Sequence, residues 1–197
     1  MGTTGTTDVS RIRSAIADSA QTISALDERA DAIAVIADAV IAALRAGNKA
    51  LTAGNGGSAA EALHFSEELV GRFRTNRPSL PAVALVADTT ALTCIGNDFG
   101  FDCVFSRQVE GLGQPGDVLV LFSTSGNAPN LALALEAARS AGVQTIALLG
   151  RDGGPLAGKA DHELIVPGTD TERIQEAHQV VLHLILDAVE MAFPCAS

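Results

Sequence analysis

Five short apolar segments, separated by stretches of helical periodicity, limit the possible folds of this chain more than any other feature. The segments are rich in β-branched residues and lie at 49–53, 82–86, 118–122, 145–149 and 163–166. Strands joined through helices pair in the same direction, because each connection returns the chain to the starting end of the sheet. The sequence therefore predicts an α/β fold built on a five-stranded parallel sheet.

Helical patterns occupy residues 1–47 and the C-terminal region. The apolar positions of the first helix are Val9, Ile12, Ile16, Ile23 and Leu26, and those of the second are Ile33, Ile36, Val40, Ile41 and Leu44. Gly47 ends the second helix, and a last long helix is predicted over 171–193. Without an internal repeat or linker, we predict one domain over 1–197, in which the α/β core and C-terminal helix occupy 48–197. The apolar stripe of the first helix indicates either subunit packing or docking within the chain.

The charge and composition of the chain exclude several classes of partner. A formal net charge of −10 argues against nucleic acid and anionic membrane surfaces. No apolar run reaches the roughly 18 residues of a membrane span, and residues 1–8 lack the basic region and apolar core of a signal peptide, so a cytoplasmic location is expected. Cys94, Cys103 and Cys195 are widely spaced and odd in number, which indicates reduced thiols rather than disulfides or a thiolate zinc site.

A hydroxyl-rich turn follows the apolar segment 118–122 and precedes a helix start. Ser123, Thr124 and Ser125 offer hydroxyl groups, and Gly126 permits a tight turn. The free N–H groups of a helix N-terminus favour an anion, and open parallel sheets bind ligands at the carboxyl ends of their strands. The turn is therefore predicted to bind phosphate. The alternative is a cluster of helix-capping residues without a ligand.

A glycine-rich turn at 54–58 follows the first apolar segment and opens another helix. Its glycines permit close approach of the backbone to a ligand, while Asn55 and Ser58 add polar side chains. The glycine spacing differs from that of a dinucleotide fingerprint. Farther along the same helix, His64 and Glu68 are four residues apart and share one face. They could converge on one ligand or metal, or they could form a solvated surface pair.

Polar residues also interrupt the apolar C-terminal helix. Gln175, Gln179 and His183 follow one row of the helix at intervals of four. Burying a row of polar side chains costs free energy, which indicates that these residues serve a function. Gln175 and His183 are roughly 12 Å apart along the helix axis, so they could just bridge one ion, or two subunits could share the task. His178 lies off this row and is predicted to be a surface or capping residue.

Asn97 and Asp98 form a further polar pair. They follow a strand and a predicted helix, and they precede another helix. We interpret them either as turn residues or as ligands of substrate hydroxyl groups.

Taken together, these segments closely resemble the phosphoheptose isomerase family, within the sugar isomerase (SIS) domain superfamily. The resemblance covers almost the whole chain. Its specific segments are AGNGGSAAEALHFSEEL at 53–69, GNDFGFD at 96–102, FSTSGN at 122–127 and ERIQEAHQVVLH at 172–183. FSTSGN alone is typical of the superfamily, whereas GNGGSAAEA and RIQEAH together indicate this family.

The resemblance implies a fold, an assembly and a reaction. The fold is a flavodoxin-like three-layer α/β sandwich with a five-stranded parallel sheet. The assembly is a homotetramer with active sites at subunit interfaces, in which the N-terminal helices serve oligomer packing. The reaction converts sedoheptulose 7-phosphate to D-glycero-D-manno-heptose 7-phosphate, an aldose–ketose isomerisation that begins the synthesis of nucleotide-activated heptose for lipopolysaccharide or capsule.

The resemblance also assigns roles to individual residues. Glu68 and His183 would be the catalytic pair. The substrate would be bound by Asn55, Gly56, Gly57, Ser58, Asn97, Asp98, Ser123, Thr124, Ser125 and Gln175. Some members carry zinc, and one zinc ion per active site would fall to His64, Glu68, Gln175 and His183. A side chain that is bound to zinc cannot exchange protons freely, so the metal-ligand and acid/base roles of Glu68 and His183 compete.

One position departs from the family pattern. Ala128 stands where the family usually has a serine, which removes one phosphate-facing hydroxyl group. A non-catalytic alternative is the SIS-domain regulator that binds a replication initiator protein, because a shared fold does not fix the function. The presence of Glu68, His183, His64 and Gln175 beside an intact phosphate loop favours an enzyme.

Overall fold

The sheet forms from the five predicted segments. A computed structural model describes residues 7–194, and within them five strands make one sheet. The strands are β1 (Ala50–Gly54), β2 (Ala82–Ala84), β3 (Val118–Ser123), β4 (Gln144–Gly150) and β5 (His162–Val166). Every pair is parallel, in the order β2-β1-β3-β4-β5, which is the flavodoxin-like order. The predicted fold class is confirmed. Residues 1–6 and Cys195, on which two sequence interpretations rest, lie outside the described residues.

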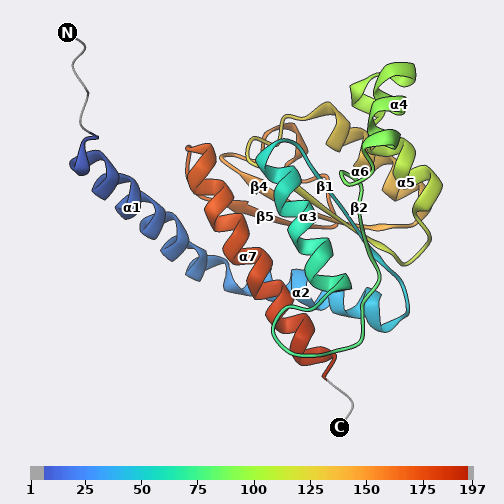
Figure 1. Cartoon of the computed structure of the whole chain (residues 1–197), viewed down its shortest axis with the longest axis horizontal. Helices are drawn as coiled ribbons and strands as arrows, with labels where there is room; N and C mark the ends of the chain where they lie inside the picture. The colour runs from blue at the N-terminus through green and yellow to red at the C-terminus, as the bar shows by residue number, and fades with distance from the viewer. Residues whose placement is uncertain (1–6, 195–197) are drawn as a thin grey trace.

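Helices cover both faces of the sheet. Along β3 all six residues are buried, and alternate side chains enter two separate apolar clusters. Val118, Val120 and Phe122 pack toward one helical layer, whereas Leu119 and Leu121 pack toward the other. The first layer contains α2 (Ala30–Arg45), α3 (Gly57–Val70) and α7 (Thr171–Ala192), and the second contains α5 (Ser106–Leu112) and α6 (Pro129–Ala141). The result is a three-layer sandwich (Figure 1).

The first helix, α1 (Val9–Ser24), projects from the body of the molecule (Figure 1) and is joined to α2 by the short 3₁₀ helix η1 (Ala25–Arg29). Within the described part of the chain, none of its residues is buried. Val9, Ile12 and Ile16 are 57%, 47% and 64% exposed. Docking within the chain therefore does not cover these three residues, although α1 also contacts α7.

The C-terminal helix α7 ends one residue before the predicted boundary. Its apolar residues Ile174, Val181 and Leu182 are buried against the sheet and its neighbouring helices. This burial explains the broad apolar face that the sequence shows. Among residues 7–194, no helix combines the length and the apolar character needed to cross a membrane.

The strand order brings two loops to one edge of the sheet. The chain leaves β1 toward β2 on one side, and β3 then pairs on the other side of β1. Ligands bind beside such a reversal in parallel sheets, at the carboxyl ends of the strands. The turns after β1 and β3 open there, and Asn55 and Asn130 join them through two amide hydrogen bonds, both 2.9 Å long.

Candidate active site

The turn after β3 has the geometry of an anion-binding loop. The Ser123 hydroxyl is buried and accepts a hydrogen bond from the Gly126 N–H at 3.0 Å, while the Ser125 hydroxyl accepts from the Asn127 N–H at 3.3 Å. Each hydroxyl oxygen therefore supports the turn and keeps its own O–H free to donate. Pro129 begins α6 without an N–H, and the N–H groups of Leu131 and Ala132 bond the Ala128 carbonyl oxygen, both at 3.2 Å. Both sequence interpretations, phosphate site and capping cluster, are compatible with these contacts.

Ala128 occupies the N-cap position of α6. Its backbone, at φ −80° and ψ 116°, has the extended conformation of a capping residue, but its side chain carries no oxygen to accept a helix N–H. Ala128 therefore leaves the start of α6 without a side-chain cap.

We expect Ala128→Ser to stabilise the protein by about 1 kcal/mol, because serine can accept one of the free N–H groups at the start of α6. Chemical denaturation at fixed protein concentration measures this change. Ala132→Ser, the same substitution inside α6, is the control and should lower stability by about 0.5 kcal/mol, since serine is a poorer helix former than alanine. Equal effects of the two variants would contradict a capping role for position 128.

The turn after β1 approaches the C-terminal helix closely. Gly56 has a φ of +58°, a conformation that favours glycine, and α3 begins at Gly57. A Cβ added to Gly57 would lie 2.1 Å from the Gln175 amide nitrogen. The predicted substrate residues Gly57 and Gln175 are thus in contact although 118 positions separate them, and only glycine leaves room for the amide.

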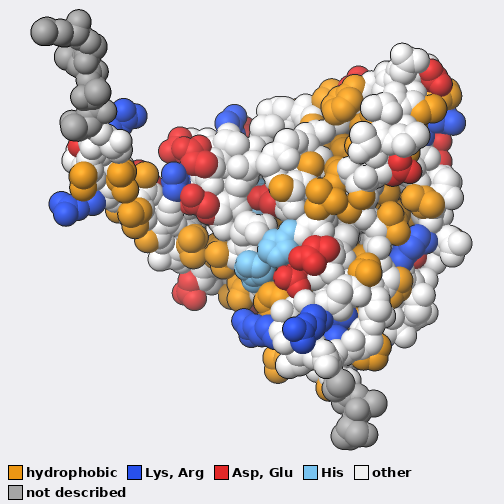
Figure 2. Space-filling view, in the orientation of Figure 1, with side chains coloured by type: hydrophobic (Ala, Val, Ile, Leu, Met, Phe, Trp, Pro, Cys, Tyr) orange, Lys and Arg blue, Asp and Glu red, His pale blue; other side chains and the backbone are white. Residues whose placement is uncertain are grey.

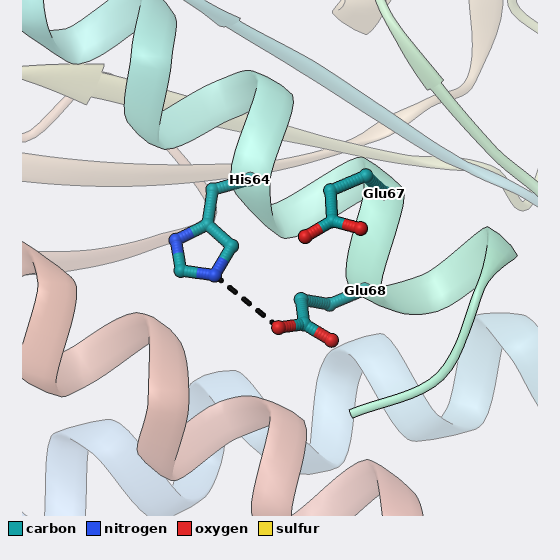
Figure 3. Close-up of side chains that lie close together, drawn as sticks. All are labelled: His64, Glu67 and Glu68. Carbon is teal, nitrogen blue, oxygen red and sulfur yellow. Dashed lines mark hydrogen bonds and ion pairs between the residues drawn. The ribbon is translucent and has the colours of Figure 1, made fainter. Parts of the chain in front are cut away.

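Three further predicted residues meet between α3 and α7. The His64 Nε2 lies 3.3 Å from the Glu68 Oε1, and the His64 ring centroid lies 5.2 Å from that of His183 in an edge arrangement. Figure 3 shows the His64 ring and the Glu68 carboxylate turned toward one another. All three side chains are half-buried, and histidine and acidic side chains gather at this place on the surface (Figure 2). The surface-pair alternative for His64 and Glu68 does not account for the approach of His183.

Gln179 orients the His64 ring, a contact that the sequence did not predict. Its amide nitrogen lies 2.9 Å from the His64 Nδ1, on the side of the ring opposite Glu68. When the amide donates to Nδ1, Nε2 carries the N–H that faces the carboxylate; zinc binding at Nε2 would instead require Nδ1–H to donate to the amide oxygen of Gln179. A groove of about 420 Å³ lies between α3 and α7. Its lining includes Gly57 and His64 of α3 and Gln175 and Gln179 of α7.

The surroundings of His183 favour its neutral form. Burial lowers its pKa below the ordinary 6.5, the neighbouring His64 lowers it further, and Glu68 acts in the opposite direction. The Phe73 ring stacks on His183, with centroids 5.7 Å apart and planes at 26°. A neutral imidazole has one N–H and one lone pair, so it can both donate and accept a proton.

The donor set suits a zinc ion in part. Two ligands about 2.0 Å from a tetrahedral zinc ion lie about 3.3 Å apart. The separation of the His64 Nε2 and the Glu68 Oε1 matches this value. Donor atoms of His64, Glu67 and Glu68 lie within 4.8 Å of one another (Figure 3). Imidazole nitrogen and carboxylate oxygen are ordinary zinc ligands, so the chemistry fits, whereas Gln175 lies against Gly57.

Asn97 and Asp98 lie elsewhere. They occupy the last turn of α4 (Thr89–Phe99), where both are exposed, so their interpretation as turn residues is wrong. The Asn97 amide nitrogen donates to the Asp98 carboxylate at 2.7 Å. In Figure 1, α4 lies apart from α7.

His178 is a buried residue, and its interpretation as a surface or capping residue is wrong. It is 0% exposed, its Nε2 lies 3.2 Å from the Leu149 carbonyl oxygen, and its Nδ1 lies 3.7 Å from the buried Glu61 carboxylate. The sequence did carry a signal, because His178 lies four residues from both Ile174 and Leu182 in the buried row of α7.

Comparison with known proteins places the chain in a family. The model of the SIS domain family matches residues 16–150. A phosphoheptose isomerase from Geobacter sp. (strain M21) is 56% identical over 163 residues, covering 83% of this chain and 85% of the relative. The chain belongs to the phosphoheptose isomerase family. The Geobacter sulfurreducens phosphoheptose isomerase is 53% identical over 171 residues, which cover 86% of this chain and 90% of that relative.

Solved structures of phosphoheptose isomerases have the same fold. That from Neisseria gonorrhoeae has a TM-score of 0.88 and 42% identity, covering 92% of this chain and 98% of its own. That from Francisella tularensis has a TM-score of 0.87 and 34% identity, covering 94% of this chain and all of its own. The family membership makes this chain an isomerase.

Proposed function

We propose that the chain converts sedoheptulose 7-phosphate to D-glycero-D-manno-heptose 7-phosphate. The family membership supports an isomerase of this class. The observation that carries the specific proposal is the convergence of Glu68 from α3 and His183 from α7 around His64, which lines the same groove as Gly57 of the turn after β1. A carboxylate and a neutral imidazole are the groups that a proton transfer next to a carbonyl requires.

In the proposed mechanism the carbonyl moves from C2 to C1 through an enediolate. Glu68 takes a proton from C1 and returns a proton to C2, so that the base is regenerated in each turnover. His183 moves protons at the two oxygens, a role that the lowered pKa of its ring supports because the neutral form can donate and accept. Each effect is worth roughly 100-fold to 10,000-fold in rate.

Substrate binding is proposed to divide between the two loops. Ser123, Thr124 and Ser125, with the N–H groups at the start of α6, would hold the phosphate and fix the far end of the substrate. The sugar hydroxyls would be bound by Asn55, Gly56, Gly57 and Ser58 of the turn after β1 and by Gln175 of α7. Asn97 and Asp98 are proposed for the same role, although α4, which carries them, lies apart from α7 within one copy of the chain.

One zinc ion per site is proposed to be held by His64, Glu68, Gln175 and His183. When bound, it would supply Lewis-acid stabilisation of negative oxygen. Gln179, through its contact with the His64 Nδ1, would orient that ligand.

The wider biological context is also a proposal. Residues 1–197 would form one SIS domain that assembles in the cytoplasm as a homotetramer, with active sites at subunit interfaces. The exposed apolar residues Val9, Ile12 and Ile16 on the projecting α1 support packing against another copy. The heptose product would enter lipopolysaccharide or capsule.

Turnover of sedoheptulose 7-phosphate by the purified protein tests the proposal. Proton NMR in deuterated water should show loss of signal at C1 or C2 through exchange with solvent. Chelation followed by added zinc should remove and restore activity, and chelator-resistant activity would contradict the metal proposal alone. Absence of turnover with zinc present would contradict the isomerase proposal and favour the regulator that binds an initiator protein.

A further inference from the structure

An irregular connection of eleven residues, 71–81, joins α3 to β2 and contacts the proposed catalytic cluster. Its only two buried residues are Arg77 and Leu80, and the remaining nine are exposed or half-buried. A segment with so little apolar burial needs polar contacts to hold one conformation. We call this segment the α3–β2 connection.

Arg77 fixes the connection to the end of α3. Its Nη1 donates to the carbonyl oxygens of Leu69, at 2.9 Å, and Pro78, at 3.0 Å, while its Nη2 donates to the carbonyl oxygen of Glu68. The last turn of α3 contains no basic residue of its own. A guanidinium group, planar and positively charged, therefore satisfies carbonyl groups that the helix end leaves free.

Glu190 fixes the connection to α7. Its two carboxylate oxygens accept hydrogen bonds from the backbone N–H groups of Arg74, at 2.9 Å, and Thr75, at 2.8 Å. Burial would raise the pKa of Glu190, but these hydrogen bonds and the charge of Arg77 outweigh it and hold the pKa below its ordinary value. The carboxylate therefore stays ionised and bonded at neutral pH.

Next to the Glu190 anchor, the connection touches the cluster itself. Phe73 stacks on the His183 ring. The Arg74 guanidinium lies over the same Phe73 ring, 4.8 Å from its centroid. Arg77 thus donates a hydrogen bond to the backbone carbonyl oxygen of Glu68. The segment that Arg77 and Glu190 hold in place carries Phe73, which packs against His183. Both members of the proposed catalytic pair depend on the same small network.

We infer that Arg77 is a positioning residue for the isomerase reaction, with Glu190 as its counterpart on α7. Arg77 does not face the groove between α3 and α7, and its contacts are to backbone carbonyls rather than to a ligand position. It acts by holding Glu68 and Phe73, and through Phe73 it holds His183. The inference rests on the proposed function, in which Glu68 and His183 exchange protons with the substrate.

Kinetics of Arg77→Met with sedoheptulose 7-phosphate test the inference. Methionine fills a similar volume but cannot donate to the three carbonyl groups. We expect kcat to fall about 10-fold to 100-fold, because small displacements of catalytic groups cost that much, while KM changes less than about 3-fold. Arg77→Lys keeps the charge and one donor position, and it should recover part of the lost kcat.

Lys49→Met is the matched control for a loss of stability. Lys49 pairs with the buried Asp117 at the start of β1, so its removal destabilises the fold without removing a contact of Arg77, Glu190 or Phe73. Its kcat per folded protein should stay within about 2-fold of the wild type. Hydrogen exchange gives a second readout: amides of residues 67–71 should exchange faster in Arg77→Met and not in Lys49→Met.

Two results would overturn the inference while the proposed function stands: a kcat of Arg77→Met within 2-fold of the wild type, or an equal loss in Lys49→Met. If Arg77→Met does not fold, Arg77→Lys decides, and a wild-type kcat together with wild-type exchange at residues 67–71 would refute it. Absence of turnover in the wild type would refute the proposed function, and the inference would fall with it.

Discussion

Glu68→Gln is expected to lower kcat by about 100-fold to 10,000-fold, the range that a lost general base costs. Glutamine has nearly the same shape, but its amide cannot accept a proton from carbon at neutral pH. The half-buried position of Glu68 beside His64 would be retained through an amide hydrogen bond. Binding of inorganic phosphate, measured by titration calorimetry, should change less than about 2-fold, because the loop after β3 does not include Glu68.

Glu67→Gln is the matched control for this prediction. Glu67 is the preceding residue on α3, carries the same charge and lies in the same group of donor atoms (Figure 3), but it is exposed. Its kcat should stay within about 3-fold of the wild type. Zinc content measured in both variants would separate a lost base from a lost ligand. A near-normal rate in Glu68→Gln would remove Glu68 from the mechanism.

The sheet could be predicted from the sequence because its strands are short, apolar and separated by helical patterns. β3 is the clearest case, since all six of its residues are buried and the segment 118–122 reads as a continuous apolar run. The parallel direction follows from the helical connections. The projection of α1 could not be predicted, because an apolar stripe has the same pattern whether it docks within the chain or against another copy.

The candidate site was predictable where its geometry is local. His64 and Glu68 are four apart on one helix, and that spacing alone brings their side chains together. The approach of Gln179 to the His64 Nδ1 depends on how α3 packs against α7, and no local pattern reports it. The same holds for Glu190, whose partners lie 115 and 116 positions away along the chain.

Single residues mark the limit of sequence reasoning. Asn97 and Asp98 are interpreted from the sequence either as turn residues or as substrate ligands because they stand between two predicted helices, but α4 continues through Gly96 to Phe99. The surface interpretation of His178 is wrong because its position off the polar row places it on the buried row of α7. In both cases the period of the helix carried more information than the chemical type of the residue.

Gly126→Ala is expected to lower the free energy of unfolding by about 4 kcal/mol or more, a loss typical of an overpacked buried contact combined with backbone strain. Gly126 has a φ of +63°, and a Cβ there would lie 1.9 Å from the Gly153 carbonyl oxygen and 2.4 Å from its carbon. Both contacts are to backbone, which cannot rotate away, and the Leu156 N–H also bonds the Gly126 carbonyl at 3.2 Å. The loop after β3 must therefore separate from the turn that supports it.

Gly158→Ala separates the clash from the strain. Gly158 has a φ of +71° in the same supporting turn, but a Cβ there would meet nothing within 4 Å. The left-handed conformation alone should cost about 1–2 kcal/mol. For a chain of this size, each kcal/mol lowers the melting temperature by about 2–4 °C, so thermal unfolding at fixed concentration distinguishes the two variants.

Because the displaced loop is the proposed phosphate site, KM for the sugar phosphate should rise at least 10-fold in Gly126→Ala and change little in Gly158→Ala. Equal effects in the two variants would mean that the contact between Gly126 and Gly153 does not hold the loop in place.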